Sequence, residues 1–214
     1  MNIYLRLARS ITIAALIGLA GGCSVFSPQP DLSHSYVLNP LAEKISPAPP
    51  PDPTLSLGVY YTDLPVYLDR PQIVARLADN QPFPDEYQRW LEPLSEGFSR
   101  VLARDIEQMT DSSHVAAFPL PPAFGQEFEV YVSVTQFDGA PGGDVTLRTQ
   151  WRISGPGGQP NYYTHESTFT RRVAPGRETA PAYVDTLSAL VGDLAREVVK
   201  ALPQAHAAKS ASRP

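Results

Sequence analysis

The thiol of Cys23 is the side chain whose position most clearly indicates chemistry in this sequence. It belongs to the only cysteine among the 214 residues, and it directly follows the small residues Ala20–Gly22. Before these come the basic residues Arg6 and Arg9 and an apolar stretch, Ile11–Leu19. That stretch is shorter than the roughly 20 apolar residues that a bilayer core requires. The order basic, apolar, small is the layout of an export signal that is cleaved after the small residues.

A cysteine at the cleavage point indicates one particular kind of export signal. In bacterial lipoproteins this thiol receives a diacylglyceryl chain. The run Leu19-Ala-Gly-Gly-Cys23 resembles the lipobox that directs this reaction, although Ala20 stands where a larger aliphatic residue is usual. We therefore predict a signal peptide over residues 1–22 and lipid attachment at Cys23, where several acyl chains would make dissociation from a membrane negligible. An ordinary signal peptide followed by a buried cysteine is the alternative.

Ser24 bears on which membrane would hold the mature chain. In Gram-negative lipoproteins an aspartate at this position favours retention at the inner membrane, so a serine indicates the outer membrane. The exported chain would enter an oxidising compartment, but its single cysteine leaves no disulfide framework. We expect a lipid-anchored protein at the outer membrane, facing the periplasm.

The net charge bounds the partners of the mature chain. Cleavage after Gly22 removes two of the 17 basic residues and none of the 22 acidic residues, which leaves a net charge of −7. Nucleic acid and anionic membrane faces attract basic patches, so neither is expected as a main partner. No second apolar stretch approaches the length of a membrane span, so we expect the acyl anchor to be the membrane contact.

The sequence offers little for catalysis or metal binding. Its histidines lie far apart and have no metal-ligand spacing; they are His34, His114, His165 and His206. No Gly-x-Ser-x-Gly elbow of a serine hydrolase occurs. Asp105 falls near an apolar helical stripe, where a boundary carboxylate is a simpler interpretation than a catalytic one. We predict no enzyme, no metal site and no cofactor.

Proline, with 23 occurrences, helps to divide the mature chain into parts. We expect residues 23–53 to contain the acylated N-terminus, a first short strand at Ser35–Leu38 and an extended Pro-rich linker of polyproline II character. Residues 54–202 are expected to form the folded domain. Residues 203–214 are small and polar, and we predict that they form a disordered tail.

Alternating apolar residues predict strands along much of the domain. We expect them at Thr54–Thr62, Gln72–Leu77, Val115–Phe118, Phe128–Thr135, Val145–Ile153 and Tyr162–Val173. The last three are joined by Gly-rich connections, which predict hairpins and an antiparallel meander. Ala78–Pro82 is a cluster of turn residues.

Apolar residues three and four apart predict two helices. The first pattern runs from about Glu86 to Met109, and because Pro93 suits only a first helical position, we expect the main helix from Glu92. The second pattern covers about Ala182–Leu202. Together the elements predict an α+β fold: a two-layer sandwich of a mainly antiparallel sheet with two helices packed on one face. The other sheet face, which carries Arg148 and Arg152, would be solvated or an interface.

The stretch Leu64–Val74 is the best candidate for a binding surface. It combines two prolines with polar and aromatic residues, and a loop with so many fixed dihedrals can present a rigid surface. The candidate partner-binding residues are Tyr67, Asp69, Arg70 and Gln72. A well-packed crossing loop, in which Asp69 and Arg70 satisfy local backbone groups, is the alternative.

The string Tyr67-Leu-Asp-Arg-Pro-Gln-Ile-Val74, together with Trp90–Leu94 and Phe98–Leu102, resembles the PqiC family of ABC-type transport auxiliary lipoproteins. The resemblance covers roughly residues 33–202. It implies an outer-membrane lipoprotein that is a non-catalytic subunit of an intermembrane lipid transport system. Its implied partner is an inner-membrane-anchored MCE-domain protein that forms a periplasmic conduit, which the lipoprotein would dock to the outer membrane.

A second function stays open at this point. The chain could be an envelope-assembly lipoprotein that binds another envelope protein without lipid transport. A homo-oligomer is compatible with either function.

Overall fold

The computed structural model describes residues 31–41, 53–77, 81–174 and 179–212, without the side chains of Tyr61 and Thr62. The predicted signal peptide, Cys23 and most of the Pro-rich linker lie outside the described residues. The chain from Ser33 onward forms one compact unit, separate from the unit Met1–Leu32.

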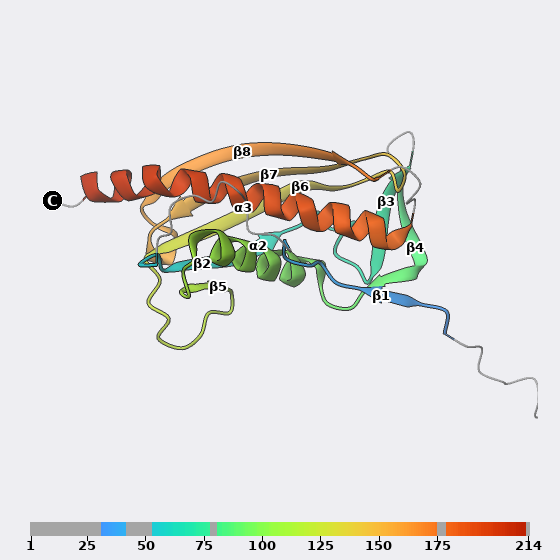
Figure 1. The fold of residues 1–214 in the computed structure, drawn as a ribbon, viewed down its shortest axis with the longest axis horizontal. Coiled ribbons are helices and arrows are strands. Elements are labelled where there is room, and N and C mark those ends of the chain that lie inside the picture. The colour runs from blue at the N-terminus through green and yellow to red at the C-terminus, as the bar shows by residue number, and fades with distance from the viewer. Residues whose placement is uncertain (1–30, 42–52, 78–80, 175–178, 213–214) are drawn as a thin grey trace, which may run out of the picture. The chain divides into compact units, whose positions relative to one another are not determined.

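Five strands form the larger sheet in the order β5-β2-β6-β7-β8 (Figure 1). They are β2 (Leu57–Asp63), β5 (Val115–Ala117), β6 (Phe128–Gly139), β7 (Asp144–Ser154) and β8 (Asn161–Arg172). β6, β7 and β8 form the expected antiparallel meander, but β2 runs parallel to both β5 and β6. The α+β class is confirmed. The sheet is mixed rather than mainly antiparallel, because β2 is connected to its neighbours by crossovers and not by hairpins.

Two helices, α2 (Leu94–Thr110) and α3 (Ala180–Ala211), pack against each other and cover one face of this sheet (Figure 1). The apolar members of the alternating strand patterns and of the helical stripes meet in this layer. Its largest fully buried side chains include Trp151, Phe98, Phe128 and Phe137. The predicted packing of both helices on one sheet face is therefore confirmed.

The helical apolar pattern extended back to about Glu86, but residues 86–90 form neither a helix nor a separate turn. They belong to β4 (Gln81–Trp90), and α2 begins at Leu94, directly after Pro93. The carboxylate of Asp85 accepts hydrogen bonds from the backbone N–H groups of Tyr87 and Gln88, at 2.9 and 3.1 Å. The apolar spacing that includes Leu91 imitates a helical stripe by chance, because Leu91 is exposed and does not contribute to the core.

β4 is the centre of a second sheet with three strands in the order β1-β4-β3, which the sequence did not predict. β1 (His34–Tyr36) pairs with it in parallel and β3 (Gln72–Leu77) in antiparallel orientation. β3 has the predicted bounds, whereas β1 begins and ends earlier than the expected strand. The smaller sheet lies at one end of the helices (Figure 1).

The C-terminal tail is helical as far as Ala211, so the prediction of disorder over 203–214 is wrong for these residues. Contacts with the start of β6 stabilise the extra turns. The ammonium group of Lys209 donates a hydrogen bond to Oε1 of Glu127 at 2.7 Å and lies 5.0 Å from the centre of the Phe128 ring. The ring of His206 packs edge-on against the same phenyl ring.

Residues Leu38–Leu41, here named the N-terminal strap, cross both helices. The Leu38 carbonyl accepts a hydrogen bond from Arg100 of α2, and the Asn39 N–H donates one to Ser188 of α3 at 3.1 Å. The Leu41 N–H donates to Oδ1 of Asp105 at 2.8 Å.

Asp105 is almost fully buried below the strap, and its other oxygen has no hydrogen-bond partner among the described residues. Burial raises the pKa of Asp105 to about 6. The carboxyl group is therefore part of the buried interior beneath the strap, whereas its position in the sequence indicated only the boundary of the apolar stripe.

Candidate functional site

The predicted loop joins β2 to β3 and is held by short-range backbone bonds. The Leu68 N–H donates to the Pro65 carbonyl at 2.8 Å, and the Arg70 N–H donates to the Leu68 carbonyl at 2.9 Å. The side chain of Leu68 is buried, whereas Asp69 and Arg70 are exposed. The loop is thus a compact turn in which Leu68 packs into the core and Asp69 and Arg70 face the solvent.

Asp138, at the end of β6, holds this loop and β3 together. Its carboxylate is fully buried and forms a two-pronged ion pair with Arg76 of β3: Nε donates to Oδ1 at 2.8 Å and Nη2 donates to Oδ2 at 2.9 Å. The hydroxyl of Tyr67 donates to Oδ2 at 2.7 Å, and Gln136 donates to Oδ1 at 3.1 Å. Charge-assisted bonds of this kind are among the stronger hydrogen bonds in proteins. The loop is therefore fixed to the larger sheet as well as to its own turn.

The titration properties of this cluster suit a structural role. Burial raises the pKa of Tyr67 to about 12, and the hydrogen bond to Asp138 adds to the shift. The pKa of Arg76 is raised as well, chiefly by its bonds to the same carboxylate. Neither group gives up its proton near neutral pH. The cluster of Asp138, Arg76 and Tyr67 therefore stabilises the fold and does not act as an acid–base pair.

Tyr183 of α3 also contributes to this cluster, from the layer of helices. Its hydroxyl donates to the carbonyl of Val74 in β3 at 3.1 Å and accepts a hydrogen bond from the N–H of Gly139 at 3.1 Å. The Tyr183 side chain therefore connects α3, β3 of the smaller sheet and the end of β6. These three elements together fix the position of the Asp138 cluster and of the loop bonded to it.

A groove of about 310 Å³ lies between the loop and the segment that leads from β4 into α2. We name it the loop–β4 groove; its lining residues are Asp69, Arg70, Pro71, Trp90, Leu91, Glu92, Pro93 and Leu94. The Trp90 N–H donates to the Pro71 carbonyl at 2.7 Å, which closes the floor. Leu91, which follows β4, is 72% exposed, and Val66, on the loop between β2 and β3, is 89% exposed. Leu91 thus adds an exposed apolar side chain to a groove that also carries the charged residues Asp69 and Arg70.

The structure brings together only part of the predicted set. Asp69 and Arg70 line the loop–β4 groove. Tyr67 points inward to Asp138, and Gln72 is half-buried at the start of β3, where it pairs with Arg89 of β4. Two of the four predicted residues thus belong to the groove, and the other two belong to its support.

Several residues of the site escaped the sequence analysis. Leu91 lies within the helical pattern that began at about Glu86, and Asp138 lies in the Gly-rich connection after the expected strand Phe128–Thr135. Arg76 offered a usable signal, since a lone charge in the buried strand Gln72–Leu77 requires a charged partner. The sequence did not say which carboxylate that partner would be.

Two features that mark other protein classes do not occur among the described residues. No group of three His, Cys, Asp or Glu side chains that could hold a metal ion occurs in this part of the chain. Within the same residues, no helix has the length and apolar character needed to cross a membrane. Fold and site together define a class: an α+β domain with shallow grooves on its surface.

The sequence then places the chain within that class. Residues 36–199 match the family model of the ABC-type transport auxiliary lipoprotein component, and the chain belongs to this family. The resemblance noted in the sequence is thereby confirmed. A search of the curated proteins finds no match.

Solved structures share the fold. A Xanthomonas campestris protein of the DUF330 family superposes with a TM-score of 0.67 at 14% identity, over 84% of this chain and 100% of the other. A crystal structure described only as that of an uncharacterized protein superposes with a TM-score of 0.61 at 16% identity, over 79% of this chain and 98% of the other. At these identities the likeness concerns the fold alone.

Proposed function

We propose that this chain is a non-catalytic subunit of an MCE-type intermembrane lipid transport system. In this proposal acylated Cys23 anchors it to the outer membrane, the domain faces the periplasm, and it docks the conduit formed by an MCE-domain protein. Membership of the auxiliary transport lipoproteins supports the general role. The partner, the membrane and the acylation belong to the proposal.

The loop–β4 groove is the observation that carries the docking role. The groove presents the charged residues Asp69 and Arg70 and the exposed apolar residue Leu91. The loop that carries the two charges is held in place by the bonds of Asp138 to Tyr67 and Arg76. A partner that binds a preformed surface loses less conformational entropy than one that must order a loop. The groove therefore has the rigidity and the mixed chemistry of a docking surface.

The anchor is tested by metabolic labelling with a fatty acid in cells that express the full chain. We expect a labelled band for the wild type and for the control Ser24→Ala, and none for Cys23→Ala. The variant should also leave the membrane fraction after cell breakage. Label that persists on Cys23→Ala would remove the anchor from the proposal without affecting the docking surface.

The partner is tested by a photo-reactive amino acid at Leu91 in intact cells, with a matched probe at Arg148 on the opposite, outer face of the larger sheet. We expect an adduct with an MCE-domain protein from position 91 and not from position 148. Arg70→Glu should reduce that adduct while the amount of folded lipoprotein stays the same. An adduct from position 91 with an envelope protein that lacks an MCE domain would instead favour envelope assembly.

A further inference from the structure

In the described part of the chain, β5 is the edge strand of the larger sheet and pairs only with β2. The Leu57 N–H donates to the His114 carbonyl at 2.9 Å, and the Phe118 N–H donates to the Val59 carbonyl at 2.8 Å. Because successive residues of a strand direct their polar backbone groups to opposite sides, the N–H and C=O groups of Val115 and Ala117 face away from β2. Among the described residues, no group outside the β2–β5 ladder bonds to them.

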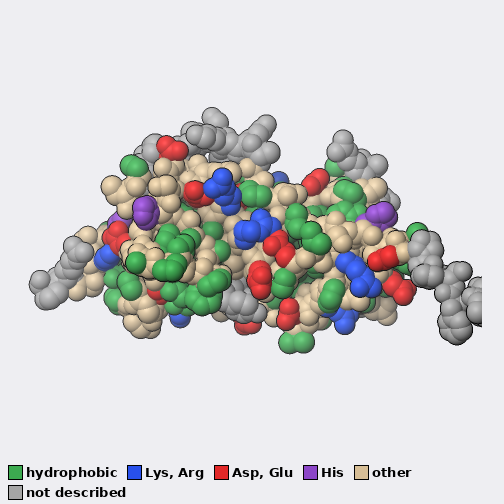
Figure 2. Space-filling view, turned by 90° about the horizontal axis from the view of Figure 1, so that it is seen from below, with side chains coloured by type: hydrophobic (Ala, Val, Ile, Leu, Met, Phe, Trp, Pro, Cys, Tyr) green, Lys and Arg blue, Asp and Glu red, His purple; other side chains and the backbone are tan. Residues whose placement is uncertain are grey.

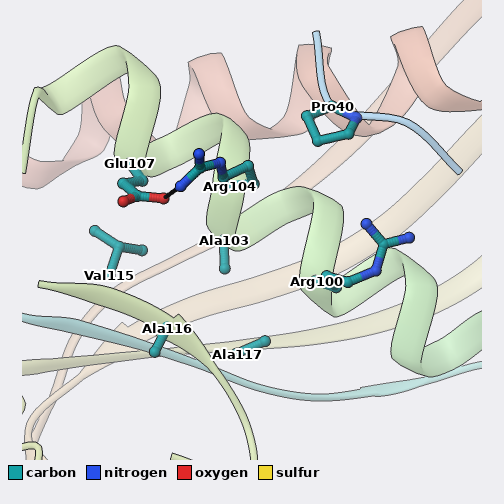
Figure 3. Close-up of a pocket in the computed structure, with 8 residues that line it drawn as sticks. All are labelled: Pro40, Arg100, Ala103, Arg104, Glu107, Val115, Ala116 and Ala117. Atoms are coloured by element: carbon teal, nitrogen blue, oxygen red, sulfur yellow. Dashed lines mark hydrogen bonds and ion pairs between the residues drawn. The ribbon is translucent and has the colours of Figure 1, made fainter. Parts of the chain in front are cut away.

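A groove of about 350 Å³ runs along this open edge, between β5 and α2 (Figure 3). Ala103 of α2 and the three residues of β5 form its apolar side, and these side chains are small. Pro40 of the N-terminal strap borders it. Small side chains on both walls leave space for another backbone beside the edge, which larger side chains would fill.

Two arginines and one glutamate line this groove, so its lining carries a net positive charge although the chain as a whole is acidic. Arg100 pairs with Glu92, and Arg104 pairs with Glu107 at 2.5 Å. In each pair the arginine is the more exposed partner, 44% against 28% and 57% against 27%. In both pairs the side chain that is more accessible to a ligand is therefore the arginine.

The chain continues from β5 into an exposed apolar loop, Phe118–Phe124, whose sequence is Phe-Pro-Leu-Pro-Pro-Ala-Phe. Phe118 is exposed, and its ring stacks on that of Tyr60 at 5.4 Å between centres. Hydrophobic side chains gather at this end of the molecule (Figure 2). The open edge thus ends next to an apolar surface that no described element covers.

We propose that β5 is an acceptor edge for an extended segment of a partner polypeptide, which adds to the larger sheet as a sixth strand. The outward backbone groups of Val115 and Ala117 bond to the segment, as in other cases of strand addition. Arg100 and Arg104 receive its acidic side chains, and the loop Phe118–Phe124 receives its apolar ones.

This surface is separate from the loop–β4 groove. The loop–β4 groove touches the first residue of α2, whereas the β5 groove lies along the second half of the helix. The inference does not depend on an MCE partner. Symmetric β5–β5 pairing of two copies is disfavoured, because it would bring two pairs of arginines to one interface.

The test uses the mature chain with Cys23→Ala and a synthetic peptide of about ten residues that alternates Glu and Val. A peptide with Lys in place of Glu serves as its control. Binding is measured by calorimetry, and amide hydrogen exchange is followed by NMR. We expect the acidic peptide to bind and to slow exchange at Val115 and Ala117 by at least about tenfold, whereas the basic peptide should do neither.

Two variants assign the contact. Ala117→Pro removes an outward N–H that the pairing with β2 does not use, and proline is tolerated on strand edges. Arg104→Glu reverses a rim charge without touching the strand. Each should weaken binding on the order of tenfold, which corresponds to about 1.4 kcal/mol. Arg148→Glu, an exposed arginine of the outer sheet face, should leave affinity within about twofold. Circular dichroism checks that each variant is folded.

Several outcomes would overturn the inference. One is equal affinity of the wild type, Ala117→Pro and Arg104→Glu for the acidic peptide. Another is strong protection of the Val115 and Ala117 amides in the free chain, which would mean that the segment 42–52 of the same chain covers the edge. A third is a dimer that Ala117→Pro dissociates, which would assign the edge to a second copy.

Discussion

Asp138→Asn is the change that should most directly loosen the candidate site. It replaces a fully buried carboxylate that accepts two bonds from Arg76 and one from Tyr67. Removing one member of a buried ion pair typically costs about 3–5 kcal/mol, because the remaining charge stays in the interior. Arg76 keeps 24% of its side chain exposed, so water relieves part of this penalty. We expect the free energy of unfolding to fall by about 3 kcal/mol.

The measurement is urea unfolding at neutral pH of the mature chain with Cys23→Ala, followed by circular dichroism. Asp144→Asn is the matched control, since Asp144 is exposed and lies 4.0 Å from Arg172; it should change stability by less than about 0.5 kcal/mol. Removing both charges with Arg76→Met and Asp138→Asn should cost less than the sum of the single changes. Additive losses, or a loss below about 1 kcal/mol for Asp138→Asn, would refute the view that this ion pair holds the loop.

Three further changes probe other parts of the fold in the same assay. Since the pKa of Asp105 is raised to about 6 in the native chain, that chain binds more protons than the unfolded one between about pH 4 and 6, and stability falls as the pH rises through this range. Asp105→Asn should abolish that fall, which amounts to about 3 kcal/mol; an unchanged pH profile would contradict the assignment. Glu129→Gln weakens the acceptor of the Gly157 and Gly158 N–H groups, at 3.0 and 2.7 Å, and should cost about 2 kcal/mol with faster amide exchange at both glycines. Truncation after Leu202 uncovers the Phe128 ring and should cost about 2 kcal/mol, whereas truncation after Ala211 should have no effect on the melting temperature.

The sequence predicted those parts of the fold whose residues alternate regularly. β6 and β7 carry their apolar residues at every second position, and the glycines between the strands limit the connections to hairpins. The helical stripe of α2 was visible for the same reason, since Phe98, Leu102 and Ile106 recur at helical spacing and are all buried. Local patterns suffice where an element has one buried face.

Long-range pairing decided the parts that were missed. Within residues 86–90, strand pairing is made with β1 and β3, and no local sequence pattern in this segment identifies those partners. The direction of β2 likewise depends on β5 and β6, which lie far along the chain. The C-terminal turns of α3 contain small and polar residues that resemble a tail, but Lys209 and Ala205 find partners in the folded domain.

The candidate site was predictable in position but not in composition. The dense mixture of prolines and polar residues located the loop correctly as a connection between two strands. Which side chains face outward depends on Asp138, because this buried carboxylate turns Tyr67 toward the interior. The exposed apolar side chain of the groove comes from Leu91, which lies directly after β4 and not in the helix that the local pattern indicated.

The N-terminal strap has a mechanical consequence. The chain that arrives from the N-terminus is bonded first to β4, through β1, and then to α2 and α3 before it reaches β2. A force on the chain N-terminal to β1 would therefore act first on the smaller sheet and on both helices, and it must break these bonds before it can strain the five-stranded sheet. Tyr36 of β1 pairs with Trp90, and its carbonyl accepts a hydrogen bond from the Leu91 N–H, so such a force would reach the loop–β4 groove directly.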